Sequence, residues 1–151
     1  MRCPFDWPEY ELQALLTRIV RGQIHHFHAM VSEMGLQRGQ PAILMRLAHK
    51  EGVAQAELAA GLCVRPASVT HSLQRLEAAG LVQRQDDPSD QRISRVFLTP
   101  AGRVMARPLE DTMRMLTDKA FAGFEQDEVD QFHTFLERVA ANLDALDAKQ
   151  E

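Results

Sequence analysis

Small, polar and cationic side chains gather on one side of the segment 66–79. If this segment is a helix and Val69 marks zero on its wheel, Leu73 and Leu76 fall within about 40° of it and should pack inward. The opposite side has no carboxylate, and amide, hydroxyl and imidazole groups there can hydrogen-bond base edges. The pattern favours a DNA-reading helix, with an ordinary solvated helix face as the alternative. The outer side carries Ala67, His71 and Gln74, flanked by Ser68, Thr70 and Arg75.

A basic hairpin is predicted directly after this segment. Two β-rich stretches, 81–85 and 92–98, flank the turn-forming residues 86–90. An arginine-bearing β-ribbon beside a reading helix can reach the adjacent minor groove. Asp90 stands two residues before Arg92 and is expected to brace its guanidinium, although the same spacing also suits a surface ion pair. The cationic side chains of the hairpin are Arg84, Arg92 and Arg95.

Breakers and apolar periodicity divide the chain into six helices and this hairpin, so we expect a mainly α fold. A proline stands at the expected first position of three helices, and Thr99 suits the cap of the fifth. The third and fourth helices, joined by a tight connection at 63–65, form a helix-turn-helix candidate. Pro108 lies inside the fifth helix and is expected to kink it. The expected helices cover about 8–34, 41–52, 55–61, 66–79, a stretch beginning at 100, and 127–148.

The first and last helices carry narrow apolar seams of the coiled-coil kind. Apolar residues alternate in steps of three and four along the last helix, and the first helix repeats that alternation. Such seams need a partner, which is either another helix of the same chain or a second copy of the chain. We expect a dimer built by both termini. Its predicted interface residues are Leu12, Leu16, Val129, Phe132, Leu136, Val139, Leu143 and Leu146.

The composition favours one helical domain. Of 151 residues, 45% are hydrophobic and 6% aromatic, and no apolar run or leader suggests a membrane span or export, so we expect a cytoplasmic protein. The net charge of −4 is uneven, because residues 104–151 carry 5 Lys/Arg against 11 Asp/Glu. Acidity confined to that third leaves room for a local basic surface elsewhere. No phosphate loop, nucleophile elbow or metalloprotease spacing is present, so we expect neither an enzyme nor a cofactor.

The hairpin and the residues after it resemble the MarR family of bacterial regulators. The family hallmark is Asp-x-Arg, then five residues, then Leu-Thr-x-x-Gly, and 90–92 with 98–102 matches every element. The segments 40–44 and 69–82 resemble the family's second helix and its recognition helix with the strand start. The resemblance covers nearly the whole chain. It implies a winged helix-turn-helix fold whose wing is the two-stranded hairpin.

The resemblance also implies a homodimer on a pseudo-palindromic DNA duplex, with the fourth helix in a major groove and the wing over a minor groove. Residues 1–34 and 104–151 would form the dimerisation helices, and 35–103 the DNA-binding lobe, within one domain. Ser89 departs from the family pattern, since many members carry a basic residue at the wing tip, and the Pro108 kink is a second departure. The residues expected to bind DNA are Arg65, Pro66, Ala67, Ser68, Thr70, His71, Gln74, Arg75, Asp90, Arg92 and Arg95.

By the same resemblance we expect a repressor that a small aromatic or phenolic effector releases from DNA. Two other kinds of sensing stay open. The histidines at 25, 26 and 28 suit either a metal ion or a solvated polar face. Cys63 stands beside Arg65 at a helix start, which suits either a reactive thiolate or a small buried residue. The opposing hypothesis is a winged-helix interaction or dimerisation module without DNA binding, which the acidic total charge favours.

Overall fold

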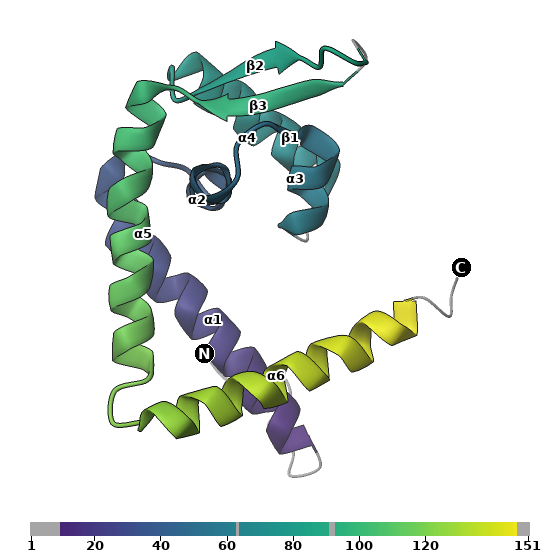
Figure 1. Ribbon diagram of the computed structural model, residues 1–151. Helices are drawn as coiled ribbons and strands as arrows, with labels where there is room; N and C mark the ends of the chain where they lie inside the picture. Colours follow the sequence, from purple (N-terminus) through teal and green to yellow (C-terminus); the bar gives the residue numbers. More distant parts are fainter. Residues whose placement is uncertain (1–9, 63, 91–92, 148–151) are drawn as a thin grey trace. The chain divides into compact units, whose positions relative to one another are not determined.

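The computed structural model describes residues 10–62, 64–90 and 93–147. It is mainly helical, as the sequence predicts, and forms two compact units, Met1–Leu116 and Thr117–Glu151 (Figure 1). None of the helices in the described ranges is long and apolar enough to cross a membrane.

Five α-helices begin in the first unit, close to the ranges that the sequence predicts. The first helix is shorter than expected, because a single turn of 3-10 helix, η2, replaces its last residues before Gly35 takes a φ of 71°. The fifth helix continues across Pro108, which lies inside it as expected. The helical elements are α1 (Glu11–Val31), η2 (Ser32–Met34), α2 (Gln40–His49), α3 (Gln55–Gly61), α4 (Pro66–Ala78) and α5 (Pro100–Ala120).

The wing belongs to a sheet of three strands, whereas the sequence predicted two. Strands β2 (Val82–Asp86) and β3 (Ser94–Leu98) form the expected antiparallel hairpin. The additional strand, β1 (Val53–Ala54), pairs with the other edge of β3 in the order β1-β3-β2. Sequence analysis missed β1 because two residues are too short to show the alternation of a strand.

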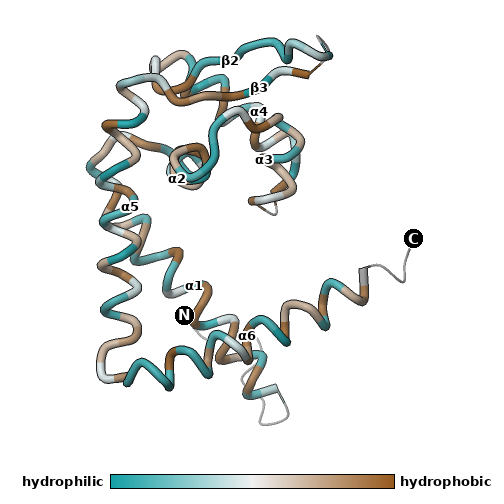
Figure 2. The backbone as a smooth tube through the Cα atoms, viewed as in Figure 1, coloured by the Kyte–Doolittle hydropathy of each residue, from teal (hydrophilic) through white to brown (hydrophobic). Residues whose placement is uncertain are grey.

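The first unit has one hydrophobic core, to which every helix and strand of that unit contributes. Figure 2 shows hydrophobic and hydrophilic residues alternating along the helices, as the amphipathic pattern requires. The three residues expected to face inward from α4 are almost fully buried. This packing determines which side of α4 faces outward. The buried hydrophobic residues are Phe27, Val31, Ile43, Leu44, Leu47, Val53, Leu58, Ala59, Val69, Leu73, Leu76, Val82, Val96, Leu98, Ala106 and Leu109.

The start of α5 is fastened to the turn between α4 and β2. The Thr99 hydroxyl accepts a hydrogen bond from the Gly102 N–H (3.0 Å), which caps the helix, and donates one to the Gly80 carbonyl (2.6 Å). A Cβ added to Gly102 would lie 2.0 Å from the carbonyl oxygen of Leu81. The Leu-Thr-x-x-Gly motif therefore has a physical basis: the threonine caps α5, and the glycine lets the helix touch the neighbouring backbone.

The second unit contains the end of α5 and helix α6 (Gln126–Asp147). The Phe121 ring meets Phe124 and Phe132 edge to face, with centroids 5.7 and 5.8 Å apart, and these contacts hold the turn between the two helices. None of the described side chains of α6 is buried. Its apolar seam is thus uncovered within this unit.

Candidate nucleic-acid interface

The side of α4 opposite its three buried residues is exposed and carries no carboxylate, as the wheel predicts, and Glu77 lies exposed nearer the end of the helix. Pro66 begins the helix, and the Arg65 carbonyl accepts the Ser68 N–H at 2.9 Å. No side chain caps this end of α4, and the positive end of the helix dipole there suits a phosphate. The exposed residues of the predicted DNA-binding set on and before this helix are Arg65, Pro66, Ala67, Ser68, His71, Gln74 and Arg75.

Thr70 differs from the exposed residues on this face because it is half-buried and its hydroxyl already makes two hydrogen bonds. Its hydroxyl accepts a hydrogen bond from Gln55 Nε2 (2.6 Å) and donates one to the Pro66 carbonyl (3.0 Å). Gln55 is the first residue of α3, so the contact locks the two helices of the helix-turn-helix together. In the free chain Thr70 holds the recognition helix in position, and base contact by Thr70 stays a prediction.

The wing turn is organised by Asp87, a residue that sequence analysis did not single out. The Asp87 carboxylate accepts hydrogen bonds from the Ser89 N–H (2.7 Å), the Ser89 hydroxyl and the Asp90 N–H (3.3 Å). Its other oxygen accepts one from Arg95 Nε. Only 4% of the Asp87 side chain is exposed. Ser89, at the tip of the wing, therefore helps to fold the turn.

These hydrogen bonds keep Asp87 ionised. The bonds from the Ser89 side chain and backbone, together with the Arg95 guanidinium, hold the pKa of the carboxyl well below its ordinary value, against the opposing effect of burial. A charged Asp87 is the stronger acceptor for all of its donors. The turn thus keeps its charge-assisted bonds across the neutral pH range.

Arg95 is directed toward the base of the wing. Besides Asp87, its guanidinium donates from Nη1 to the Gly52 carbonyl at 2.8 Å, so one side chain ties the wing turn to the backbone next to β1. In the free chain Arg95 therefore braces the wing turn, and we had expected it to contact DNA. DNA contact by Arg95 stays untested. The hairpin contains an Asp–Arg brace between Asp87 and Arg95, and the brace expected between Asp90 and Arg92 stays a prediction because Arg92 lies outside the described residues.

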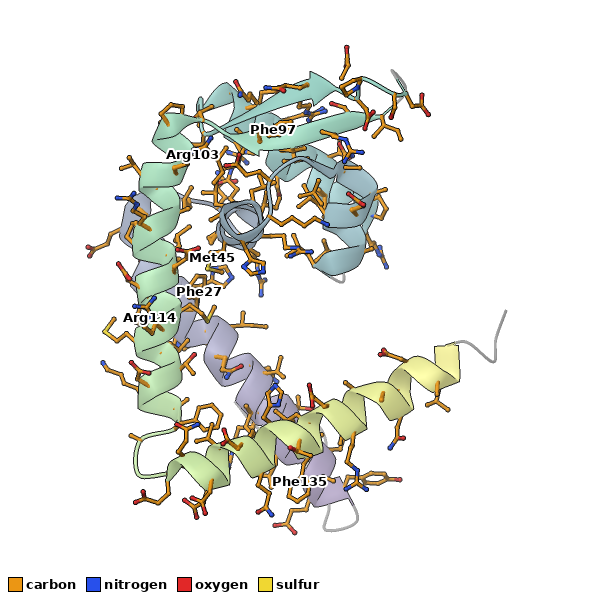
Figure 3. The ribbon with its side chains drawn as sticks, viewed as in Figure 1. Phe27, Met45, Phe97, Arg103, Arg114 and Phe135 are labelled. Carbon is orange, nitrogen blue, oxygen red and sulfur yellow. The ribbon has the colours of Figure 1, made fainter. Side chains whose placement is uncertain are left out.

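Arg84 and Arg103 are also held by the fold. Arg84 Nε lies 3.4 Å from a Glu77 carboxylate oxygen, which draws this side chain back toward α4. Arg103 donates to the Glu51 carboxylate and to the Leu98 carbonyl (3.2 Å), and Figure 3 shows it near Phe97 at the base of the sheet. These contacts tie the base of the wing to α4 and to the start of α5.

The comparisons with known proteins agree with this geometry. The MarR family model matches residues 36–94, from the loop before α2 to the start of β3. A MarR-family transcriptional regulator from Silicibacter pomeroyi, known from its crystal structure, is 32% identical and superposes with a TM-score of 0.80. That alignment covers 89% of this chain and 90% of the other. The chain belongs to the MarR family.

Curated relatives agree with that assignment. The HTH-type transcriptional regulator YybA of Bacillus subtilis is 27% identical over 112 residues, which is 74% of this chain and 75% of YybA. An HTH-type transcriptional repressor of Mycobacterium bovis is 29% identical over 114 residues, which is 76% of this chain and 82% of that protein. MarR proteins are DNA-binding transcriptional regulators rather than enzymes. This chain is accordingly a DNA-binding regulator, and the hypothesis of a winged-helix module without DNA binding is set aside.

Two of the predicted residues of this MarR protein lie outside the residues that the structure describes. Arg92 and Cys63 lie outside the described residues, so the wing arginine of the hallmark and the candidate redox thiol stay predictions. Asp90 is exposed, and its carbonyl accepts the Ile93 N–H at 2.9 Å. For the histidines of α1, the described ranges contain no group of three His, Cys, Asp or Glu side chains that could hold a metal ion.

The predicted dimer residues are largely uncovered in the single chain. Leu12 is 72% exposed, and Leu143 is 59% exposed. Such exposure of large apolar side chains at regular helical spacing marks a surface that is normally covered. The half-buried members of the predicted set are Leu16, Val129 and Phe132, and the exposed members are Leu12, Leu136, Val139, Leu143 and Leu146.

Proposed function

We propose that this MarR protein is a homodimeric repressor that binds a pseudo-palindromic operator and is released by a small-molecule effector. The observation that carries the proposal is the exposed, carboxylate-free face of α4, held in register by Gln55 and flanked by the braced wing. Two such faces related by a twofold axis would enter successive major grooves about 34–36 Å apart. A regulator of this kind acts where the DNA is, so we propose a cytoplasmic location.

The proposed division of labour follows from chemistry. His71 and Gln74 would contact base edges, because both lie exposed on the outer side of α4 and can hydrogen-bond bases. Arg65 and Arg75 would neutralise phosphates, and Arg92 would serve the wing. Residues 1–34 and 104–151 would supply the dimer contacts, with the lobe 35–103 on the DNA.

The uncovered seam of α6 supports the homodimer, since an apolar stripe of this kind is stabilised when a second copy covers it. Repression is supported by the Mycobacterium relative, which is itself a repressor. Release by an effector requires that the effector bind the conformation that does not fit DNA more tightly than the one that does.

Fluorescence anisotropy tests the DNA-binding part directly. The full-length protein is titrated into labelled duplex from upstream of its own gene and into a scrambled duplex, each at two salt concentrations. We expect tighter binding to the natural duplex and a loss of affinity with salt that reports the number of phosphates neutralised. Equal binding to both duplexes, or no binding at low salt, would contradict the proposal.

A further inference from the structure

The loop before α2 carries an exposed cation beside α4. Arg38 is exposed, and it lines a cavity of about 350 Å³ together with Ser68 and Ser72 of α4. The loop lies directly against this helix, because a Cβ added to Gly39 would be 3.4 Å from the Ser72 hydroxyl oxygen. Arg38 was not among the residues that the sequence predicted to bind DNA, since nothing in its own segment indicates that α4 is its neighbour.

The two flanks of the outer face of α4 meet different parts of the first unit. Glu77 lies on one flank and is 3.4 Å from Arg84 Nε of β2, so the wing hairpin lies on this side. On the helical wheel, Ser68 and Arg75 lie on the opposite flank. Arg75 lines a second cavity, of about 380 Å³, together with Gln37 of the loop before α2. The loop therefore borders the flank of α4 that faces away from the wing.

Hydrogen bonds fix this loop in the free chain. The Gln37 N–H donates to Oε1 of Gln40 at 2.6 Å, and the Gln40 N–H donates to the Gln37 carbonyl at 3.0 Å. Gln40 is only 6% exposed, so its side chain anchors the loop to the protein interior. Gly39 has a φ of 89°, which a residue with a side chain rarely adopts. Arg38 thus projects from a backbone that is ordered before any partner binds, which lowers the entropy lost on binding.

The surroundings of Arg38 favour an anion. No carboxylate lines either cavity, and Arg38 makes no ion pair within the described ranges. Glu33, the acidic residue nearest to it in the sequence, lines neither cavity. A guanidinium presents forked N–H donors that match a phosphate. Since a helix fills the major groove, and two phosphate strands border that groove, a cation at one flank of α4 lies near one of these strands.

We propose that Arg38 binds phosphates of the DNA strand that borders the major groove on the side away from the wing. The wing and Arg38 then hold the duplex from the two flanks of α4, and Arg75 contacts the same strand as Arg38. Phosphate contacts fix the position of the helix without reading the sequence, so Arg38 adds affinity for every duplex alike. The inference rests on the proposed function, because it takes from it the placement of α4 in a major groove.

Fluorescence anisotropy of Arg38→Gln on the natural and scrambled duplexes, at a series of salt concentrations, tests the contact. We expect both affinities to fall by the same factor, about tenfold or more, because a charge-assisted contact is lost. The salt slope should decrease by about one unit for each chain bound, since one phosphate is no longer neutralised. Arg38→Lys keeps the charge and should keep the wild-type slope.

Arg114→Gln is the matched control. It removes the same charge from an exposed position on α5 that lines neither cavity (Figure 3). This variant should bind both duplexes with wild-type affinity and slope. Circular dichroism melts establish that all of the variants fold.

Ethylation interference on the natural duplex locates the contact, because an ethylated phosphate has lost its charge. Some phosphates should weaken wild-type binding when they are ethylated but no longer weaken binding by Arg38→Gln. We expect these phosphates on one strand, next to those identified in the same way with Arg75→Gln. The remaining phosphates should interfere as they do with wild type.

Three results would overturn the inference while wild type binds DNA. They are wild-type affinity and slope in Arg38→Gln, an equal loss in Arg114→Gln, and interference positions that do not adjoin those of Arg75→Gln. Wild-type protein that binds no duplex would contradict the proposed function as well. The wild-type binding curve therefore distinguishes failure of this inference from failure of the proposed function.

Discussion

Helices α4 and α6 both carry apolar residues at helical spacing, yet only α4 has its apolar side covered. On α4, Leu73 and Leu76 are completely buried against α2, α3 and the sheet. On α6, Leu136 and Leu143 are 41% and 59% exposed. The α4 region therefore contains its own core and can hold a DNA-facing surface rigid. The apolar side of α6 is left uncovered in the single chain, and we propose that a second copy of the chain covers it.

The largest effect is expected on α6. Leu136→Ala with Leu143→Ala should weaken the dimer by at least a factor of about 1000, because each truncated leucine costs about 1 kcal/mol or more and a twofold axis counts each one twice. Analytical ultracentrifugation of the variant measures this. Arg138→Ala, on the opposite side of α6, is the control and should stay dimeric. An unchanged dimer in the double variant would show that α6 does not form the interface.

The next largest effect is expected where α5 meets the wing region. Gly102→Ala puts a methyl group against the Leu81 carbonyl and should cost about 1–3 kcal/mol or more, because the backbone must move apart. Gly22→Ala, in open space on α1, is the control and should be neutral or stabilising by up to about 1 kcal/mol. Thermal melts distinguish the two. Equal melting temperatures for the two variants would contradict the account of this junction.

The variants Gln74→Ala and Arg75→Ala should separate sequence-specific base contact from sequence-independent phosphate binding. Gln74→Ala should cost about 1–3 kcal/mol on the operator and relax specificity, because it removes a base contact. Arg75→Ala should weaken all duplexes alike and lower the salt slope by about one unit. Anisotropy on natural and scrambled duplexes at several salt concentrations measures both. The reverse pattern would exchange the roles of the two residues.

A smaller effect is expected from the contact between α3 and α4. A double-mutant cycle of Gln55→Ala and Thr70→Val should give a coupling energy of about 0.5–1.5 kcal/mol in unfolding, since the two side chains share one hydrogen bond. Chemical denaturation of the four proteins yields the value. Additive effects would mean that the bond contributes nothing to joining the helices.

The smallest effect is expected from pH at the wing. The folded-state pKa of Asp87 is lowered, so its contribution to stability is fully present above its ordinary value of 3.8 and is lost only as pH falls below that value. The NMR shift of the Ser89 amide should stay flat from pH 8 to about pH 5, since the carboxyl is ionised throughout. Titration of that amide near neutral pH would contradict the brace, and Asp87→Asn should remove the acid-range change.

Local features of the sequence predicted much of this structure. The inward face of α4 and the Thr99 cap follow from spacing within a few residues, and the structure has them where the sequence indicated. The seams on α1 and α6 indicated which side needs covering, but spacing alone does not say what covers it.

Long-range contacts were beyond sequence reasoning. The bond from Arg95 to the Gly52 carbonyl joins residues 43 positions apart, and β1 becomes a strand only because β3 offers it an edge. The hydrogen bond between Gln55 and Thr70 joins two different helices, so sequence spacing did not reveal it. For Arg95 and Thr70 the residue type indicated a polar role, and only the fold determined which group each one bonds.

The central claim is that two chains act together on one DNA site. Sedimentation of the full-length protein with a duplex carrying the whole operator, and with a duplex carrying one half-site, tests it most directly. We predict two chains per full operator, with binding to the half-site far weaker. One chain per operator, with equal affinity for both duplexes, would contradict the account.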